Sequence, residues 1–138
     1  MVEICIEGQP VSQPRPRVTK FGTYTPKDHP VHAYRQAIAI ECQRYTKLEG
    51  PVAVHVEFYI RLPKGQHRKR NPVIVKPHTK RPDIDNFLKA VFDGMGDGGL
   101  LNDDGQIAEV RAQKFYASQD GEPRTLIRVF KLNERNTK

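Results

Sequence analysis

The sequence predicts an α+β fold in which a mixed β-sheet carries two main helices packed on one face. The chain has 138 residues, the size of one ordinary domain, so residues 1–138 are expected to form a single domain. Apolar residues recur at a period of two in several segments and at helical spacing in two others. The resulting order of strand, helix, strand, helix, strand, strand is typical of helices on one face of a mixed sheet.

Alternation of apolar and polar residues predicts the strands. It is visible over residues 2–7 and is cleanest over residues 52–61. Residues 106–117 and 124–132 are predicted as two further strands, joined as a hairpin near residues 120–123, where turn-forming residues gather.

Two amphipathic helices are predicted between the strands. Over residues 31–47, an apolar or aromatic residue recurs every three or four positions. A second apolar stripe covers residues 85–95, and the glycine-rich run at 94–99 is expected to end that helix.

The connections are polar and rich in proline. Five prolines in residues 8–30 exclude a helix there and favour a loop or an irregular hairpin. Residues 62–81 are predicted as a long polar loop, in which residues 73–75 could form a short extended piece. The polar tail at 133–138 is expected to fray.

Composition limits the class of protein. No run of about 18 apolar residues is present, so no membrane span is expected. The first residues include acids where a signal peptide carries lysine or arginine. Cys5 and Cys42 are predicted to be buried reduced thiols of a cytoplasmic protein, and neither has the spacing of a zinc ligand.

The balance of charge favours a polyanionic partner. The formal net charge is +7, and basic side chains that neutralise phosphates release condensed counterions. Two stretches, residues 8–27 and 58–82, contain no acid. These basic stretches predict a DNA-binding surface made of Arg15, Arg17, Lys20, Arg68, Lys69, Arg70, Lys76, Lys80 and Arg81.

An acidic cluster follows the second basic stretch. If residues 83–85 are extended, Asp83 and Asp85 point to the same side and form a two-carboxylate cation site. Helical spacing then places Asp85, Lys89 and Asp93 on one face. Hard oxygen ligands suit Mg²⁺, which can bind a phosphodiester and activate a water molecule for its hydrolysis. A third carboxylate could come from Asp103 or Asp104.

Each acidic residue also has a structural interpretation. Asp83 or Asp85 could serve only as the N-cap of the second helix. Asp85 and Lys89 could form an ordinary exposed ion pair, and residues 103–105 could be only a turn. The spacing alone leaves the functional and the structural interpretations open.

Two longer motifs resemble a known family. Residues 80–93, KRPDIDNFLKAVFD, with residues 101–107, LNDDGQI, are similar to the RusA family of Holliday junction resolvases. The N-terminal residues 8–17 and 24–26 resemble its phage-type members, so the similarity covers most of the chain.

The resemblance implies a Mg²⁺-dependent, homodimeric endodeoxyribonuclease that nicks four-way DNA junctions symmetrically, in DNA recombination and repair. By position, Asp83, Asp85 and Asp104 match the catalytic, metal-binding aspartates, and Lys89 matches the essential lysine. Asp103 lies next to this set. Such a protein is expected to be cytoplasmic, encoded by a bacterium or a phage, and associated with the nucleoid.

The same residues are compatible with two other functions. The chain could be a non-catalytic protein that binds junctions or other DNA, with a structural acidic cluster. It could also be a nuclease of the PD-(D/E)xK type that uses Pro82 and Asp83 with Glu109 and Arg111, although that motif requires lysine where Arg111 stands.

Overall fold

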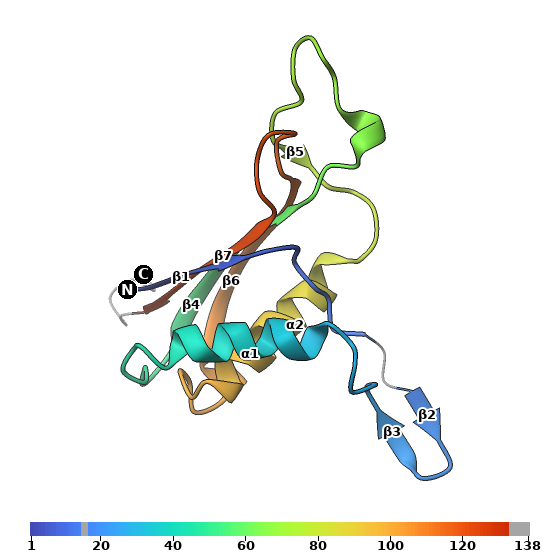
Figure 1. Cartoon of the computed structure of the whole chain (residues 1–138). Helices are drawn as coiled ribbons and strands as arrows, with labels where there is room; N and C mark the ends of the chain where they lie inside the picture. Colours follow the sequence, from blue (N-terminus) through green and yellow to red (C-terminus); the bar gives the residue numbers. More distant parts are fainter. Residues whose placement is uncertain (15–16, 133–138) are drawn as a thin grey trace.

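The fold is a five-stranded mixed sheet with two helices (Figure 1). The computed structural model describes residues 1–14 and 17–132. The strand order in the sheet is β1-β7-β4-β6-β5, and only the β4–β6 pair is parallel. The strands are β1 (Val2–Glu7), β4 (Val52–Ile60), β5 (Lys76–Pro77), β6 (Ile107–Tyr116) and β7 (Arg124–Lys131).

Both helices contribute to the main core, and the predicted α+β class is confirmed. Helix α1 (Val31–Cys42) and helix α2 (Ile84–Asp97) lie side by side against the sheet. The apolar residues of β1 are buried in strict alternation, as the period of two predicts. Ile38 of α1 and Met95 of α2 are fully buried in this core.

Two glycines let the helices approach closely. A Cβ atom at Gly94 would lie 2.9 Å from the Cβ of Ile38, and one at Gly98 would lie 2.6 Å from the carbonyl oxygen of Ala39. The prediction that the glycine-rich run ends α2 is correct in outline, but the helix continues to Asp97. Gly94 and Gly96 therefore lie inside the helix, and tight packing accounts for Gly94.

The predicted hairpin between residues 106–117 and 124–132 is wrong. Both segments are strands, but β4 lies between them, parallel to β6 and antiparallel to β7. Alternation of apolar and polar residues identifies a half-buried strand, but it does not identify the strand next to it. The turn residues at 120–123 suit a connection that crosses β4 as well as they suit a tight hairpin.

Other local expectations need correction. Helix α1 ends at Cys42 rather than at residue 47, and Cys5 is exposed rather than buried. The extended piece in the long loop is β5, just after the expected residues 73–75. The proline-rich segment contains the antiparallel strands β2 (Arg17–Thr19) and β3 (Gly22–Tyr24), in agreement with an irregular hairpin.

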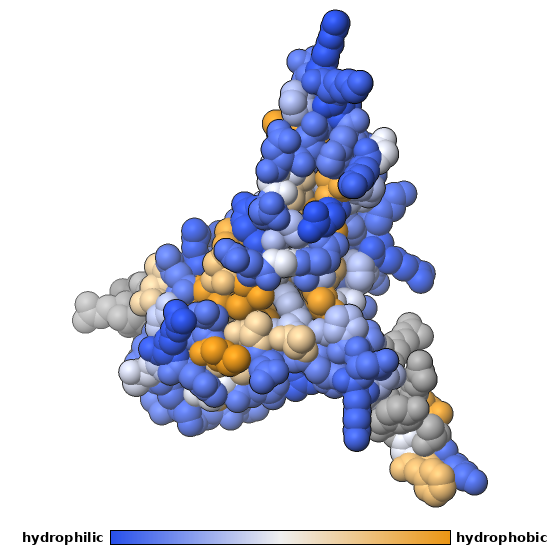
Figure 2. All heavy atoms as spheres, viewed as in Figure 1, coloured by the Kyte–Doolittle hydropathy of each residue, from blue (hydrophilic) through white to orange (hydrophobic). Residues whose placement is uncertain are grey.

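Two regions project from the body of the molecule (Figure 1). One is the segment that follows β4 and ends with β5, residues 62–77, called here the basic arm; the other is the β2–β3 hairpin. The arm has a small core of its own, made of Leu62, Val73 and Tyr116. The face of the arm seen in Figure 2 is mostly hydrophilic, and the arm also exposes Ile74 and Val75. No helix in the described residues is long and apolar enough to cross a membrane.

Candidate active site

The first turn of α2 carries the paired aspartates. Asp83 is the N-cap residue with an extended backbone, and Asp85 lies in the first turn of the helix. The condition under which the sequence predicts that Asp83 and Asp85 point to the same side, an extended backbone over residues 83–85, is not met, because the helix begins at Ile84. Both aspartates are exposed, at the helix end where the backbone dipole favours negative charge.

Most of the oxygens of these aspartates are not used by the fold. The side chain of Asp83 makes no capping hydrogen bond, although it occupies the capping position. Asp85 Oδ1 accepts a hydrogen bond from the adjacent backbone N–H of Asn86 at 3.0 Å. Within residues 1–14 and 17–132, no ion pair joins Asp85 to Lys89. Asp83 thus occupies the N-cap position without making a side-chain cap, and the expected alternative of an Asp85–Lys89 ion pair is not seen among the described residues.

Lys114 of β6 holds the segment that leads into α2. Its Nζ donates hydrogen bonds of 2.8 Å to the carbonyl oxygens of Lys80 and Pro82. The second of these carbonyls belongs to the residue before Asp83, so Lys114 fixes the backbone next to this carboxylate. In the sequence, Lys114 is one more polar residue on an alternating strand, and no signal singles it out.

Asp83 borders a hollow at the end of β6. The lining includes His78, Ala112, Lys114 and Phe115. Burial and then the charge of Lys114 lower the pKa of His78, so this imidazole favours its neutral form. The ring of His78 packs on Tyr116, with 4.5 Å between the ring centroids.

Asp104 lies next to the other end of α2. It borders a hollow together with Arg35, Asp93 and Asp97. Burial, followed by the charges of Asp93 and Asp103, raises the pKa of Asp104. Arg35 is bound to Asp97 at 2.8 Å, so the nearest cation is already paired.

The three matched aspartates do not converge within one chain. Asp85 and Asp93 are eight residues apart on α2, about 12 Å along the helix axis at ~1.5 Å per residue. Asp104 neighbours Asp93, far from the first turn. In the described part of the chain, no group of three or more His, Cys, Asp or Glu residues could hold one metal ion.

Gln106 fixes the loop that carries Asp104. Its side-chain oxygen accepts hydrogen bonds from the backbone N–H groups of Asn102 at 2.6 Å and Asp103 at 3.2 Å. Its side-chain nitrogen donates to the carbonyl oxygens of Leu48 and Gly50. Sequence reasoning did not single out this residue.

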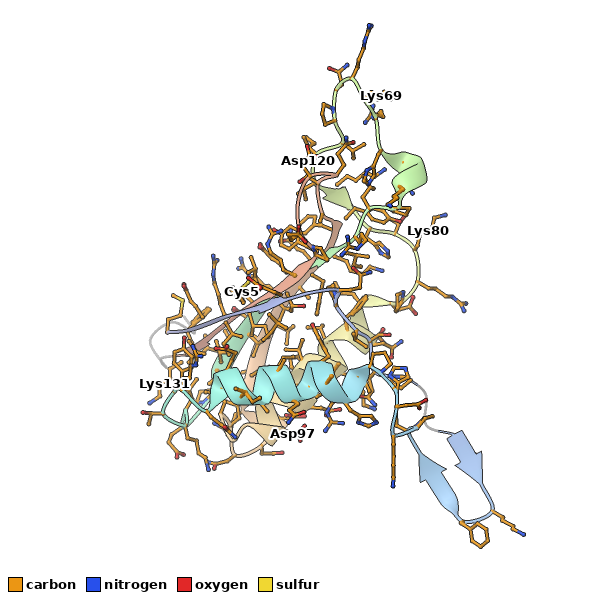
Figure 3. All side chains as sticks on the ribbon, in the orientation of Figure 1. Cys5, Lys69, Lys80, Asp97, Asp120 and Lys131 are labelled. Atoms are coloured by element: carbon orange, nitrogen blue, oxygen red, sulfur yellow. The ribbon has the colours of Figure 1, made fainter. Side chains whose placement is uncertain are left out.

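The basic residues occupy both projections and the segment between β5 and α2. Arg68, Lys69 and Arg70 are exposed in the basic arm, and Figure 3 places Lys69 near its end. Lys80 and Arg81 are exposed on the segment that leads into α2. Lys20 is exposed on the β2–β3 hairpin, and Lys76 is hydrogen-bonded to Gln66 in the arm. Arg15 and the side chain of Arg17 lie outside the described part of the protein.

Gln119 braces the basic arm from the β6–β7 connection. Its side-chain oxygen accepts from the backbone N–H groups of Arg68 at 3.0 Å and Val73 at 2.9 Å, and its nitrogen donates to the carbonyl oxygen of Arg68 at 2.8 Å. The three neighbouring basic residues at 68–70 are thus attached to an ordered backbone.

Glu109 does not face the paired aspartates. Its carboxylate is bound to the Nε2 atom of His55 at 2.8 Å. It is not among the residues that border the hollow beside Asp83. This arrangement gives no support to a PD-(D/E)xK site.

Comparison with known proteins gives the family. The family model described as "Endodeoxyribonuclease RusA" matches residues 7–130, a range that contains both projections and all the matched aspartates. The uncharacterized protein YqaN of Bacillus subtilis (strain 168) is 29% identical over 139 residues, which cover 93% of this chain and 94% of that protein. The chain belongs to the RusA family of endodeoxyribonucleases.

Proposed function

We propose that the protein is a homodimeric, Mg²⁺-dependent endonuclease that resolves four-way DNA junctions by paired hydrolysis, in recombination and repair. Membership of the RusA family supports nuclease activity on Holliday junctions. One observation carries the assignment to this site: the exposed side chains of Asp83 and Asp85 have few protein hydrogen-bond partners, at the helix end that lies between two basic projections (Figure 1).

The donor atoms at this site fit a divalent cation. Carboxylate oxygens are the ligands that Mg²⁺ prefers, and this ion is usually held by one or two carboxylates, with waters and substrate phosphates as the other ligands. Asp83 offers both of its oxygens and Asp85 at least one. When bound, the cation lowers the pKa of a coordinated water and stabilises the charge that develops on the phosphate.

The protein residues have separate roles in this proposal. Asp83 and Asp85 hold the cation, and the N-cap position fixes Asp83 relative to the helix. Lys89 lies one turn beyond Asp85, where its ammonium group can contact the scissile phosphate. Lys114 positions the backbone before Asp83 through its two hydrogen bonds.

The two projections hold the DNA arms. The basic arm supplies Arg68, Lys69 and Arg70, and the hairpin supplies Lys20. Each phosphate contact makes affinity depend on salt, with a slope of about −0.9 per contact in the log–log plot. The hairpin also exposes Val18 and Phe21, at 82% and 90%. An exposed aromatic ring provides a surface on which an unstacked base at a branch point can pack.

A second subunit supplies the third carboxylate. In one chain Asp104 lies beside Asp93, two turns of α2 away from Asp85. A two-fold dimer contains two copies of each surface, so Asp104 of one subunit can complete the site formed by Asp83 and Asp85 of the other. Two equivalent sites also suit a junction with two equivalent strands to cut.

The primary test is a cleavage assay on a synthetic immobile four-way junction, with a linear duplex of the same sequence beside it. Paired symmetric nicks in the junction alone, in Mg²⁺ and not in EDTA, are the expected result. They should disappear in Asp85→Asn while junction binding remains. Tight binding without cleavage in Mg²⁺ or Mn²⁺ would instead favour a non-catalytic junction-binding protein.

Mixed dimers test the shared site. Asp85→Asn and Asp104→Asn subunits are each expected to be inactive alone. When they are mixed and allowed to exchange, one site of the heterodimer combines an intact Asp85 with an intact Asp104 from the other subunit. Single nicks should then return. If the mixture stays inactive although exchange is demonstrated, all three aspartates act within one subunit.

A further inference from the structure

The sheet ends in a long unpaired strand edge on β6. On one side β6 pairs with β4 along its length, but on the other side only Phe115 and Tyr116 pair, with β5. Among the described residues, the opposite side of positions 107–113 has no strand partner, and the carbonyl oxygen of Lys114 accepts a hydrogen bond from the backbone N–H of His78. A register shift against β4 at Ala108 leaves a regular edge from Glu109 onward. Natural proteins protect such edges, because an exposed edge invites pairing with another chain. Val110, in the middle, is 42% exposed.

The residues of this edge are complementary to themselves. In a sheet continued across a two-fold axis, the two β6 strands run antiparallel and paired residues lie on the same face. If the axis passes through Val110, Glu109 of each strand lies opposite Arg111 of the other. Shifting the axis to Glu109 or Arg111 would place like charges against each other, which is unfavourable. Charge therefore selects the register centred on Val110.

This register also addresses the separation of the aspartates. It brings the start of β6 of one copy, which follows Gln106, to the end of β6 of the other, which carries Lys114. Asp104 precedes Gln106 by two residues, and Lys114 is bonded to the carbonyl oxygen of Pro82, next to Asp83. The hollow beside Asp83 lies at the same end of β6, where the start of the partner strand would arrive.

We infer that two copies of this chain join through antiparallel pairing of their β6 edges, centred on Val110, and that this pairing brings Asp104 of each subunit to Asp83 and Asp85 of the other. The inference rests on the proposed function, from which it takes the homodimer and the shared site. It adds the interface and its register. The other edge of the sheet, β1, serves as the comparison, because it offers the alternative place for edge pairing.

Charge reversal tests the register without DNA or metal. Sedimentation equilibrium near 0.15 M salt should show a wild-type dimer. Arg111→Glu places two glutamates opposite each other at two symmetric positions, so the dissociation constant should rise about tenfold or more. The double variant Glu109→Arg with Arg111→Glu restores opposite charges and should restore the dimer. Glu3→Arg, on β1, is the matched control and should change nothing; thermal unfolding verifies that each variant folds.

A cross-link tests the geometry directly. Residues at the axis of an antiparallel pair have Cα atoms about 4.5–5.5 Å apart, within the range that a disulfide spans. Val110→Cys in a Cys5→Ser background should therefore form a covalent dimer on oxidation. Cys5→Ser alone should not, because Cys42 is buried.

The outcomes separate the interface from the nuclease. Loss of the dimer in Arg111→Glu, recovery in the double variant and the cross-link together support the inference, whether or not junctions are cut. A wild-type dimer that Arg111→Glu leaves intact, with no cross-link at position 110, overturns it while junction cleavage still stands. A monomer at all accessible concentrations overturns it as well.

Discussion

Two irregular regions of the molecule, the loop before β6 and the basic arm, are each held by one glutamine. Gln106 makes four hydrogen bonds to backbone groups around residues 48–50 and 102–103. Gln119 makes three to the backbone of the arm. The first loop is attached to the main core and carries Asp104, whereas the second lies far from that core and carries cations. In the proposed function, the same kind of side chain therefore positions a metal ligand in one region and DNA contacts in the other.

This difference implies that substitutions in the two regions should change different properties of the protein. Disturbing the loop before β6 should lower the rate of cleavage, while disturbing the arm should lower affinity. The largest effect is expected when the carboxylate itself is removed. Asp104→Asn should reduce junction cleavage about 10³-fold, since loss of a metal ligand removes several kcal/mol of transition-state stabilisation at ~1.4 kcal/mol per tenfold. Gel-shift affinity in EDTA should stay within a factor of two; a parallel fall in affinity would contradict the separation.

A smaller loss of rate is expected from Gln106→Ala. The substitution removes all four hydrogen bonds that position the loop, and groups that orient a metal ligand typically contribute 10–100-fold. Part of the loss should be recovered at high Mg²⁺, because a misplaced ligand weakens ion binding. Single-turnover rates against Mg²⁺ concentration measure this. Gln36→Ala, an exposed glutamine on α1, is the matched control.

A substitution that loosens the basic arm should weaken the binding of junction DNA. Gln119→Ala removes the three side-chain hydrogen bonds to Arg68 and Val73, while the backbone bond from residue 119 to the carbonyl oxygen of Val73 remains. DNA binding must then order the backbone around residue 68, at a cost of about 1–2 kcal/mol, or roughly five- to thirtyfold in Kd. The cleavage rate at saturating enzyme should be unchanged. The salt dependence should also be unchanged, because no charge is lost. If the slope of log affinity against log salt concentration fell in magnitude by one or more, the arm would have lost contacts with phosphate.

The smallest effect concerns stability and pH. The pKa of Asp104 is raised in the folded state, so this carboxylate disfavours folding when ionised. The cost is absent below the pKa of the unfolded chain, develops as pH rises through the folded pKa, and is complete at neutral pH. In EDTA, Asp104→Asn should therefore unfold at a slightly higher temperature than wild type at pH 7 and at the same temperature near pH 3. A variant less stable at pH 7 would contradict the assignment.

Local patterns in the sequence determined most of the elements and the candidate residues. Periodicity of two and of 3.6 identified the main strands and helices, because burial of one face imposes those periods. The acidic motif identified Asp83, Asp85, Lys89 and Asp104 as candidates through their residue types and their resemblance to the RusA family. The two acid-free stretches predicted a DNA-binding surface, because the charges of the side chains are known from the sequence alone.

Only the tertiary structure decided which elements are neighbours and which polar side chains the fold uses. Strand pairing depends on contacts between distant segments, so the insertion of β4 between β6 and β7 could not be read from alternation. Lys114 and Gln119 bind backbone groups 32 to 51 positions away in the chain, and Gln106 joins the neighbouring residues 102–103 to backbone groups 56 and 58 positions away. The position of Asp104, far from the first turn of α2, is likewise set by tertiary contacts and could not be read from the sequence. Hydrogen bonds and charges act through space, and sequence spacing describes that space only within one helix or strand.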